Sequence, residues 1–95
     1  MDLNIKKIRA IVSGRVQGVG FRISTLQKAR RIGVRGYVQN LTNGNVEIVA
    51  LGQADKVDNL LQWAKSGPPS AIVNSLEVEV ITDNDKEFPG FEILR

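Results

Sequence analysis

The sequence predicts an α+β fold in which two helices cover one face of a mainly antiparallel sheet. The 95 residues, of which 42% are apolar and 24% charged, suffice for one globular domain with a single core. Apolar residues alternate in some segments and recur at helical spacing in others. In chain order these segments predict a strand, a helix, two strands, a helix and a strand, followed by one further strand at the C-terminus.

The first predicted elements lead into and out of a glycine-rich loop. Ile8, Ala10 and Val12 alternate with mostly more polar neighbours, which indicates a half-buried strand running into that loop. Apolar residues then recur at helical spacing over 21–32, so a helix opens at Arg22 and ends before Gly33.

The remaining elements form a hairpin, a helix and two strands. Strands are expected over 34–40 and 46–51, and the Asn-Gly pair in the connection 41–45 favours a hairpin with Asn43 and Gly44 as turn residues. A helix over 54–66 stops at the sequence Gly-Pro-Pro that follows it. The alternating segment 71–82 is a strand, 83–87 a polar loop, and 88–94 a last strand.

This order of elements favours a ferredoxin-like βαββαβ sandwich with an extra C-terminal strand, formed as a single domain over residues 1–95. The predicted core comprises Ile8, Ala10, Val12, Ile23, Leu26, Val57, Leu60, Leu61 and Val78, and Trp63 and Phe91 are also expected there. The fold class serves enzymes, RNA binders and metal carriers alike, so function has to come from particular residues.

The composition excludes several kinds of chemistry. The chain has no cysteine and no histidine, which removes disulfides, thiolate nucleophiles, the commonest metal ligand and the commonest general base. We therefore expect no metal site and no cofactor. The first ten residues carry four charges and have no long apolar core, and no apolar segment of the chain is long enough to span a membrane, so we expect a cytoplasmic protein without a membrane partner.

Charge is distributed unevenly along the chain. Residues 1–40 contain nine Lys/Arg and one acid, whereas residues 41–95 contain four Lys/Arg and nine acids. The two parts thus carry net charges of +8 and −5. A basic segment of this kind would attract a small anion, although solvated faces of ordinary helices and strands account equally well for several of these charges.

A glycine-rich segment, Gly14 to Arg22 (GRVQGVGFR), connects the first predicted strand to the first helix. Glycines let several backbone N–H groups converge on an anion, and a helix start adds unpaired N–H groups and a favourable dipole. Arg22 supplies a permanent charge and two donors for phosphate oxygens. The segment lacks the endings of the Walker and dinucleotide motifs, and such a turn alone is more often a simple connection than a site.

With a second segment in view, the chain resembles the acylphosphatase family. Ser13 to Arg22 follows the glycine-loop motif of that family throughout, and Gly36 to Asn40 with Gly44 to Glu47 looks like its second motif. Gly52, the Gly-Pro-Pro sequence at 67–69 and Ala71 also match. The resemblance covers almost the whole chain. It implies a ferredoxin-like enzyme that hydrolyses the mixed anhydride between a carboxylate and phosphate.

The resemblance also implies a role for each site residue. Arg22 would bind the phosphate and Asn40 would position the attacking water, so that both are catalytic. The backbone N–H groups that would complete the phosphate site belong to Val16, Gln17, Gly18, Val19, Gly20 and Phe21. Without this context, Asn40 is more typical of a turn or cap, and Arg22 could be a solvated arginine. A cation at a helix start is unfavourable, however, and needs an anion partner.

Three positions depart from the family pattern. Tyr37 stands where a tryptophan is usual, Gln39 where a basic residue is common, and Leu41 where some members have a hydroxyl residue. The missing charge at Gln39 is expected to alter the affinity for anionic acyl groups. Leu41 means that any water contact through a hydroxyl there is absent or comes from Thr42.

The reaction suits a site without a proton donor. A carboxylate leaving group is already stable as an anion at neutral pH, because carboxylic acids ionise near pH ~4. An alkyl phosphate would release a far more basic alkoxide, which needs an acid or a metal. We therefore expect a small-molecule acyl phosphate as substrate, hydrolysed by a monomer without metal.

Two alternatives remain open at the level of the sequence. The first is a non-catalytic phosphate- or anion-binding domain, or a regulatory one, since acylphosphatase-like domains occur inside larger maturation proteins. The second is a nucleic-acid binder, suggested by the topology and a pI near 9.6. The five aromatic residues are scattered rather than clustered on strands, so we expect no nucleic-acid partner.

Overall fold

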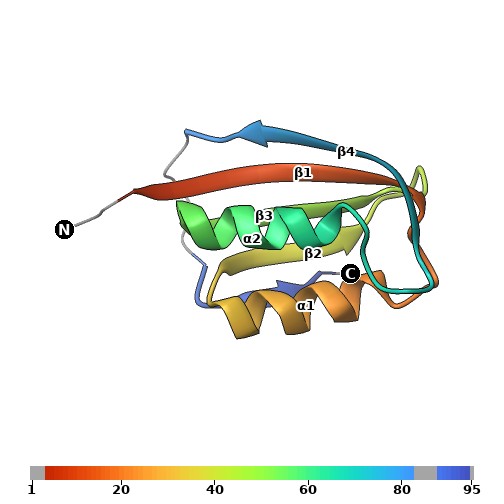
Figure 1. The fold of residues 1–95 in the computed structure, drawn as a ribbon, viewed down its shortest axis with the longest axis horizontal. Coiled ribbons are helices and arrows are strands. Elements are labelled where there is room, and N and C mark those ends of the chain that lie inside the picture. The colour runs from red at the N-terminus through yellow and green to blue at the C-terminus, as the bar shows by residue number, and fades with distance from the viewer. Residues whose placement is uncertain (1–3, 83–87, 95) are drawn as a thin grey trace.

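The computed structural model describes residues 4–82 and 88–94, and it contains two helices and five strands (Figure 1). The predicted polar loop 83–87 lies outside the described residues. The elements in chain order are β1 (Ile5–Arg15), α1 (Phe21–Ile32), β2 (Arg35–Asn40), β3 (Val46–Gln53), α2 (Ala54–Ala64), β4 (Ile72–Val80) and β5 (Phe91–Ile93).

The five strands form one sheet in the order β4-β1-β3-β2-β5. All neighbouring pairs are antiparallel except β2 and β5, which run parallel. Figure 1 shows α1 and α2 on the same side of the sheet. Helix α2 packs mainly on β1 and β3, and α1 on β2 and β5. The ferredoxin-like fold with an extra C-terminal strand is therefore confirmed.

The core lies between the helices and the middle of the sheet, as the apolar spacing predicted. Three residues of β1 and three of α2 that were predicted to be core are buried: Ile8, Ala10, Val12, Val57, Leu60 and Leu61. Phe91 is buried too, whereas Leu26 and Trp63 are partly buried and pack against the core.

The prediction of a core position is wrong for two residues. Val78 is 43% exposed, although it pairs with the buried Ala10 on the same face of the sheet. Its strand, β4, lies at one edge of the sheet, and the helices make their main sheet contacts with the other four strands. Ile23 is 48% exposed because it lies in the first turn of α1 and lines a cavity instead of the core.

The boundaries of several elements also differ from the prediction. Strand β1 continues to Arg15, so Gly14 belongs to the sheet rather than to the loop. The pairing of β1 with β4 shifts at Gly14, and a Cβ there would lie 2.2 Å from the carbonyl oxygen of Ile72. Helix α2 and strands β4 and β5 are shorter than expected. Pro89 precedes β5 and has no N–H for a sheet hydrogen bond, which fits its short length.

Among the described residues, no helix is long and apolar enough to cross a membrane.

Candidate active site

The connection between β1 and α1 has the backbone shape that an anion site requires. Gly18 and Gly20 both have positive φ angles, of 75° and 80°, and Gly20 is the N-cap of α1. Within the described residues, no side chain caps this helix start, and its first turn contains no acid. The first N–H groups of α1 therefore present the positive end of the helix dipole without a side-chain partner.

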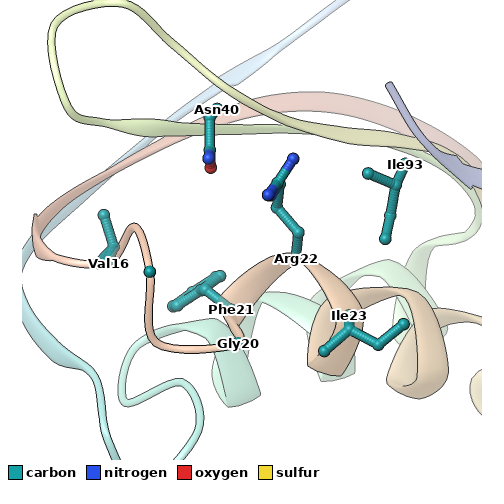
Figure 2. A pocket seen from close by; sticks show the side chains of 8 residues that line it. Val16, Gly20, Phe21, Arg22, Ile23, Asn40 and Ile93 are labelled. Carbon is teal, nitrogen blue, oxygen red and sulfur yellow. The ribbon is translucent and has the colours of Figure 1, made fainter. Parts of the chain in front are cut away.

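A cavity of about 170 Å³ opens at this helix start (Figure 2). The lining residues come from the loop, α1, β2 and β5: Val16, Gly18, Gly20, Phe21, Arg22, Ile23, Asn40 and Ile93. Figure 2 shows the side chains of Arg22 and Asn40 pointing into the cavity from opposite sides. The two polar residues singled out in the sequence thus share one cavity, although they belong to a helix and a strand.

Asn40 places an unpaired acceptor at the cavity. It is the last residue of β2 and pairs with Val46 of β3, which fixes its backbone in the sheet. Its side-chain oxygen Oδ1 is buried and has no hydrogen-bond partner among the described residues. An unpaired buried acceptor is unfavourable unless a bound group supplies a donor. A water molecule in the cavity could donate to this oxygen.

The predicted phosphate-binding residues divide into two groups. Val16, Gly18, Gly20, Phe21 and Arg22 line the cavity, whereas Gln17 and Val19 do not. Val19 packs against the core. Gln17 instead holds the loop to the hairpin, because its side-chain Nε2 donates hydrogen bonds of 2.8 Å to the carbonyl oxygens of Leu41 and Asn45. The turn that follows Asn40 is thereby connected directly to the glycine-rich loop.

Phe21 forms the buried base of the cavity. Its side chain is 1% exposed, and the ring of Trp63 lies 5.5 Å from it between centroids. The hydroxyl of Thr25 donates a hydrogen bond of 2.7 Å to the carbonyl oxygen of Phe21. The contact between the rings of Phe21 and Trp63 and the hydrogen bond from Thr25 thus both fix the first turn of α1.

Sequence reasoning missed two residues of the cavity. The helical spacing placed Ile23 in the core, yet its position directly after Arg22 puts it at the cavity. Ile93 reaches the cavity because β5 pairs in parallel with β2, where Ile93 is in register with Val38. No local sequence pattern predicts this pairing, because the two strands are far apart in the chain.

Gln39 lies on the opposite face of the sheet from Asn40, because successive strand residues point to opposite faces. Its Nε2 donates a hydrogen bond of 2.6 Å to the carboxylate of Glu47, which also accepts one of 2.5 Å from Nε of Arg9. Gln39 does not line the cavity, so its expected effect on anionic acyl groups stays a prediction that direct contact within this cavity would not explain.

The same cluster shifts two pKa values. The pKa of Arg9 is raised, first by its hydrogen bond to Glu47. The pKa of Tyr37 is raised above its ordinary 10.0, mainly by burial and next by the negative charge of Glu47. Glu47 is only 6% exposed, whereas the side chain of Arg9 is 40% exposed, so water reaches one partner of this ion pair.

In the part of the chain that the structure describes, no three Asp or Glu residues lie together in a way that could hold a metal ion. The cavity itself has backbone N–H groups, a guanidinium and an amide. These groups suit an anion rather than a cation.

Known proteins resemble this chain in sequence and in structure. A family model described as Acylphosphatase matches residues 8–93. The chain is 47% identical over 92 residues to an acylphosphatase of Acaryochloris marina (strain MBIC 11017), covering 97% of each. The structure of an acylphosphatase from Coxiella burnetii superposes with a TM-score of 0.89 at 38% identity, covering 96% of this chain and 94% of the other. An acylphosphatase from Bacillus subtilis gives 0.88 at 32%, covering 95% and 99%.

Proposed function

Because this chain belongs to the acylphosphatase family, we propose that Arg22 and Asn40 are its catalytic residues and that residues 16–22 hold the phosphate. The protein is an acylphosphatase, an enzyme that hydrolyses the carboxyl–phosphate anhydride of acyl phosphates. The proposal concerns which groups carry out that reaction and how.

The phosphate binds at the start of α1. The N–H groups of the loop and of the first helical turn donate to its oxygens, and the guanidinium of Arg22 neutralises part of its charge. Charge on these oxygens changes as the bonds to phosphorus break and form, so fixed donors stabilise the transition state without rearranging. The absence of an acid from the first turn of α1 leaves these donors available.

The side-chain oxygen of Asn40 accepts a hydrogen bond from a water and holds it in line with phosphorus. The water oxygen forms a bond to phosphorus while the bond between phosphorus and the acyl oxygen breaks. The carboxylate leaves with that electron pair, and the protons of the water pass to the phosphate and the solvent. The products are a carboxylate and inorganic phosphate, with no covalent enzyme intermediate.

The leaving group explains why no acid is required. A carboxylic acid ionises near pH ~4, so the carboxylate departs unprotonated at neutral pH. Among the described residues, the cavity lining includes no carboxyl or phenol group that would act as a general acid. The site is therefore suited to acyl phosphates and not to alkyl phosphates.

One observation favours a catalytic site over a site that only binds an anion. A phosphate held by the loop and Arg22 needs only donors, yet the cavity also contains the buried, unpaired acceptor of Asn40. A phosphate dianion would be repelled by that oxygen, whereas a water would be oriented by it. A site that only binds phosphate would use the amide nitrogen of Asn40 as a donor and would not use its oxygen.

The first experiment measures the hydrolysis of benzoyl phosphate with and without excess EDTA, beside Arg22→Ala and Asn40→Ala. We expect Asn40→Ala to lower kcat about 100-fold with little change in KM, because water positioning acts in the transition state. Arg22→Ala should lower kcat and also weaken competitive inhibition by inorganic phosphate about 10-fold, because it loses a charged donor. EDTA should change the wild-type rate less than about twofold.

Two exposed residues serve as matched controls. Arg30→Ala removes another arginine of α1, and Asn59→Ala removes an exposed asparagine of α2, so neither should alter the kinetics. An alkyl phosphate should not be turned over. A folded Asn40→Ala enzyme with unchanged kcat would contradict the water-positioning role, and strong EDTA inhibition would contradict the metal-free mechanism.

The protein is also proposed to work as a single-domain monomer in the cytoplasm. In its support, one chain supplies both proposed catalytic side chains, Arg22 and Asn40, to the same cavity, so the proposed reaction needs no residue of a second copy. Light scattering of the purified protein at several concentrations tests this, and a mass near twice 10.4 kDa would contradict it.

A further inference from the structure

Part of the cavity consists of groups that a phosphate does not need. Ile23 of α1 and Ile93 of β5 both line it, and Ile23 keeps 48% of its surface exposed. Two apolar side chains that line one cavity offer a surface on which an apolar ligand group can be buried. Among the described residues that line the cavity, Arg22 is the one charged side chain.

The position of the phosphate determines where its acyl substituent lies. With the phosphate against the loop and the start of α1, in-line attack places the leaving carboxylate on the side of phosphorus away from the water. Asn40 holds that water. In Figure 2, Ile23 lies across the cavity from Asn40, and Ile93 lies on the far side of Arg22 from Val16. Both isoleucines thus lie at the end of the cavity away from Val16, where an acyl group that extends out of the phosphate loop would pass.

We propose that Ile23 and Ile93 form an acyl subsite that selects uncharged, apolar acyl groups and disfavours acyl groups that carry a second anion. The inference rests on the proposed function, because it takes the phosphate and water positions from it. An apolar acyl group buries its surface against the two side chains. A carboxylate in the same place would lose hydration without gaining a cation, since Arg22 is occupied by the phosphate.

The first test compares two substrates that differ only in charge at the far end of the acyl group. Benzoyl phosphate and 4-carboxybenzoyl phosphate share the aromatic ring and the anhydride, and each enzymatic kcat/KM is divided by the rate of uncatalysed hydrolysis. We expect the wild type to prefer benzoyl phosphate at least about fivefold. Acetyl phosphate serves as the short reference substrate.

Charge at position 23 should then control the preference. Ile23→Lys should shift the ratio of the two kcat/KM values about fivefold toward 4-carboxybenzoyl phosphate, and Ile23→Glu should shift it in the opposite direction. Ile93→Ala should lower the ratio for benzoyl over acetyl phosphate about fivefold through lost apolar contact. The substitutions at Ile23 replace an exposed side chain, so the fold should tolerate them.

A matched control tests whether added charge alone is responsible. Ile5 is 59% exposed at the far end of β1 from the loop, so Ile5→Lys adds the same charge away from the cavity and should leave the ratio unchanged. Equal use of both aromatic substrates by the wild type, with no response to Ile23→Lys or Ile23→Glu, would overturn the subsite while leaving the acylphosphatase mechanism intact. A folded wild type that hydrolyses none of the three substrates would overturn both.

Discussion

Asn40 and Arg22 are each placed where they do not favour the folded state. The side-chain oxygen of Asn40 is buried without a hydrogen-bond partner in the described part of the chain, and Arg22 lies at a helix start, where the dipole repels a cation. No ion pair relieves Arg22 among the described residues. Residues that violate local preferences in this way are characteristic of functional sites, where the ligand supplies the missing interaction.

Removing these residues should therefore lower activity without lowering stability. We expect the free energy of unfolding of Asn40→Ala and of Arg22→Ala to equal or exceed that of the wild type by up to about 1 kcal/mol. Denaturant unfolding of each variant measures this. Inorganic phosphate should stabilise the wild type more than Arg22→Ala, and a variant that loses several kcal/mol would show that its side chain has a structural role instead.

The ionisation of Tyr37 reports on the cluster of Arg9, Gln39 and Glu47, which lies on the face of the sheet opposite Asn40. Tyr37 is the single tyrosine of the chain, so near-ultraviolet tyrosinate absorbance reports on it alone. Burial and the charge of Glu47 raise its pKa, so ionisation should be half complete above pH 10.0. The stability that this shift contributes is fully present below the ordinary pKa and is lost as pH rises through the raised one.

A charge-removing variant separates the two causes of that shift. Glu47→Gln should lower the pKa of Tyr37, because the carboxylate no longer opposes the phenolate while the positive charge of Arg9 still favours it. Glu77→Gln, at an exposed position of β4, is the control and should not move the titration. An unchanged midpoint in Glu47→Gln would mean that burial alone sets the pKa.

At the scale of elements, the site depends on how the loop 16–20 is attached to the β2–β3 hairpin. The glycines allow the loop its shape, but they do not fix its position relative to Asn40. The two hydrogen bonds from the side chain of Gln17 to Leu41 and Asn45 provide that connection. A hydrogen-bonded link of this kind holds reacting groups within a fraction of an ångström, which catalysis requires.

Gln17→Ala should therefore reduce catalysis although the side chain does not line the cavity. We expect kcat/KM for benzoyl phosphate to fall about 10-fold, because the loop and Asn40 lose their common fixed geometry. The exposed Gln62→Ala on α2 is the matched control and should behave as the wild type. Inhibition by inorganic phosphate distinguishes the causes: a purely structural effect on the loop would weaken it as much as kcat, whereas misalignment with Asn40 would lower kcat more.

At the scale of the whole molecule, the two helices are too few to cover five strands evenly. They pack mainly on β1, β3, β2 and β5, so the helix-side face of the edge strand β4 keeps Val78 and Val80 exposed at 43% and 62%. The alternating pattern of β4 is as regular as that of β1. Val73 and Leu76 of β4 pack against the core, but Val78 and Val80 do not, because burial depends on how far the helices extend over the strand.

Because the helices cover β1 but not this part of β4, the same Val→Thr substitution should destabilise the protein more in β1 than in β4. Val12→Thr in β1 should lower the free energy of unfolding by about 2 kcal/mol, because it buries a hydroxyl in the core. Val78→Thr in β4 should change it by less than about 0.5 kcal/mol, because its hydroxyl reaches water. Denaturant unfolding compares the two isosteric changes, and equal losses would show that β4 is covered in solution.

The sequence by itself determined the order of the elements and several of the buried apolar residues, and it singled out the two polar residues that line the cavity. Apolar periodicity is a local property, and a hairpin or a helix end depends on a few neighbouring residues, so both are visible in the chain. The glycines and Arg22 likewise stand together in one segment. The family resemblance then added Asn40, which spacing alone would have assigned to a turn.

Only the tertiary structure decided which apolar residues are buried and which reach the cavity. Val78 and Ile23 fit the pattern of core residues, yet one lies on an uncovered edge strand and the other at the rim of the site. Ile93 joins the cavity through a parallel pairing with β2, and Gln39 turns away from it. Burial and proximity between distant segments depend on how helices and strands pack together, and that packing is not encoded in any local window of the chain.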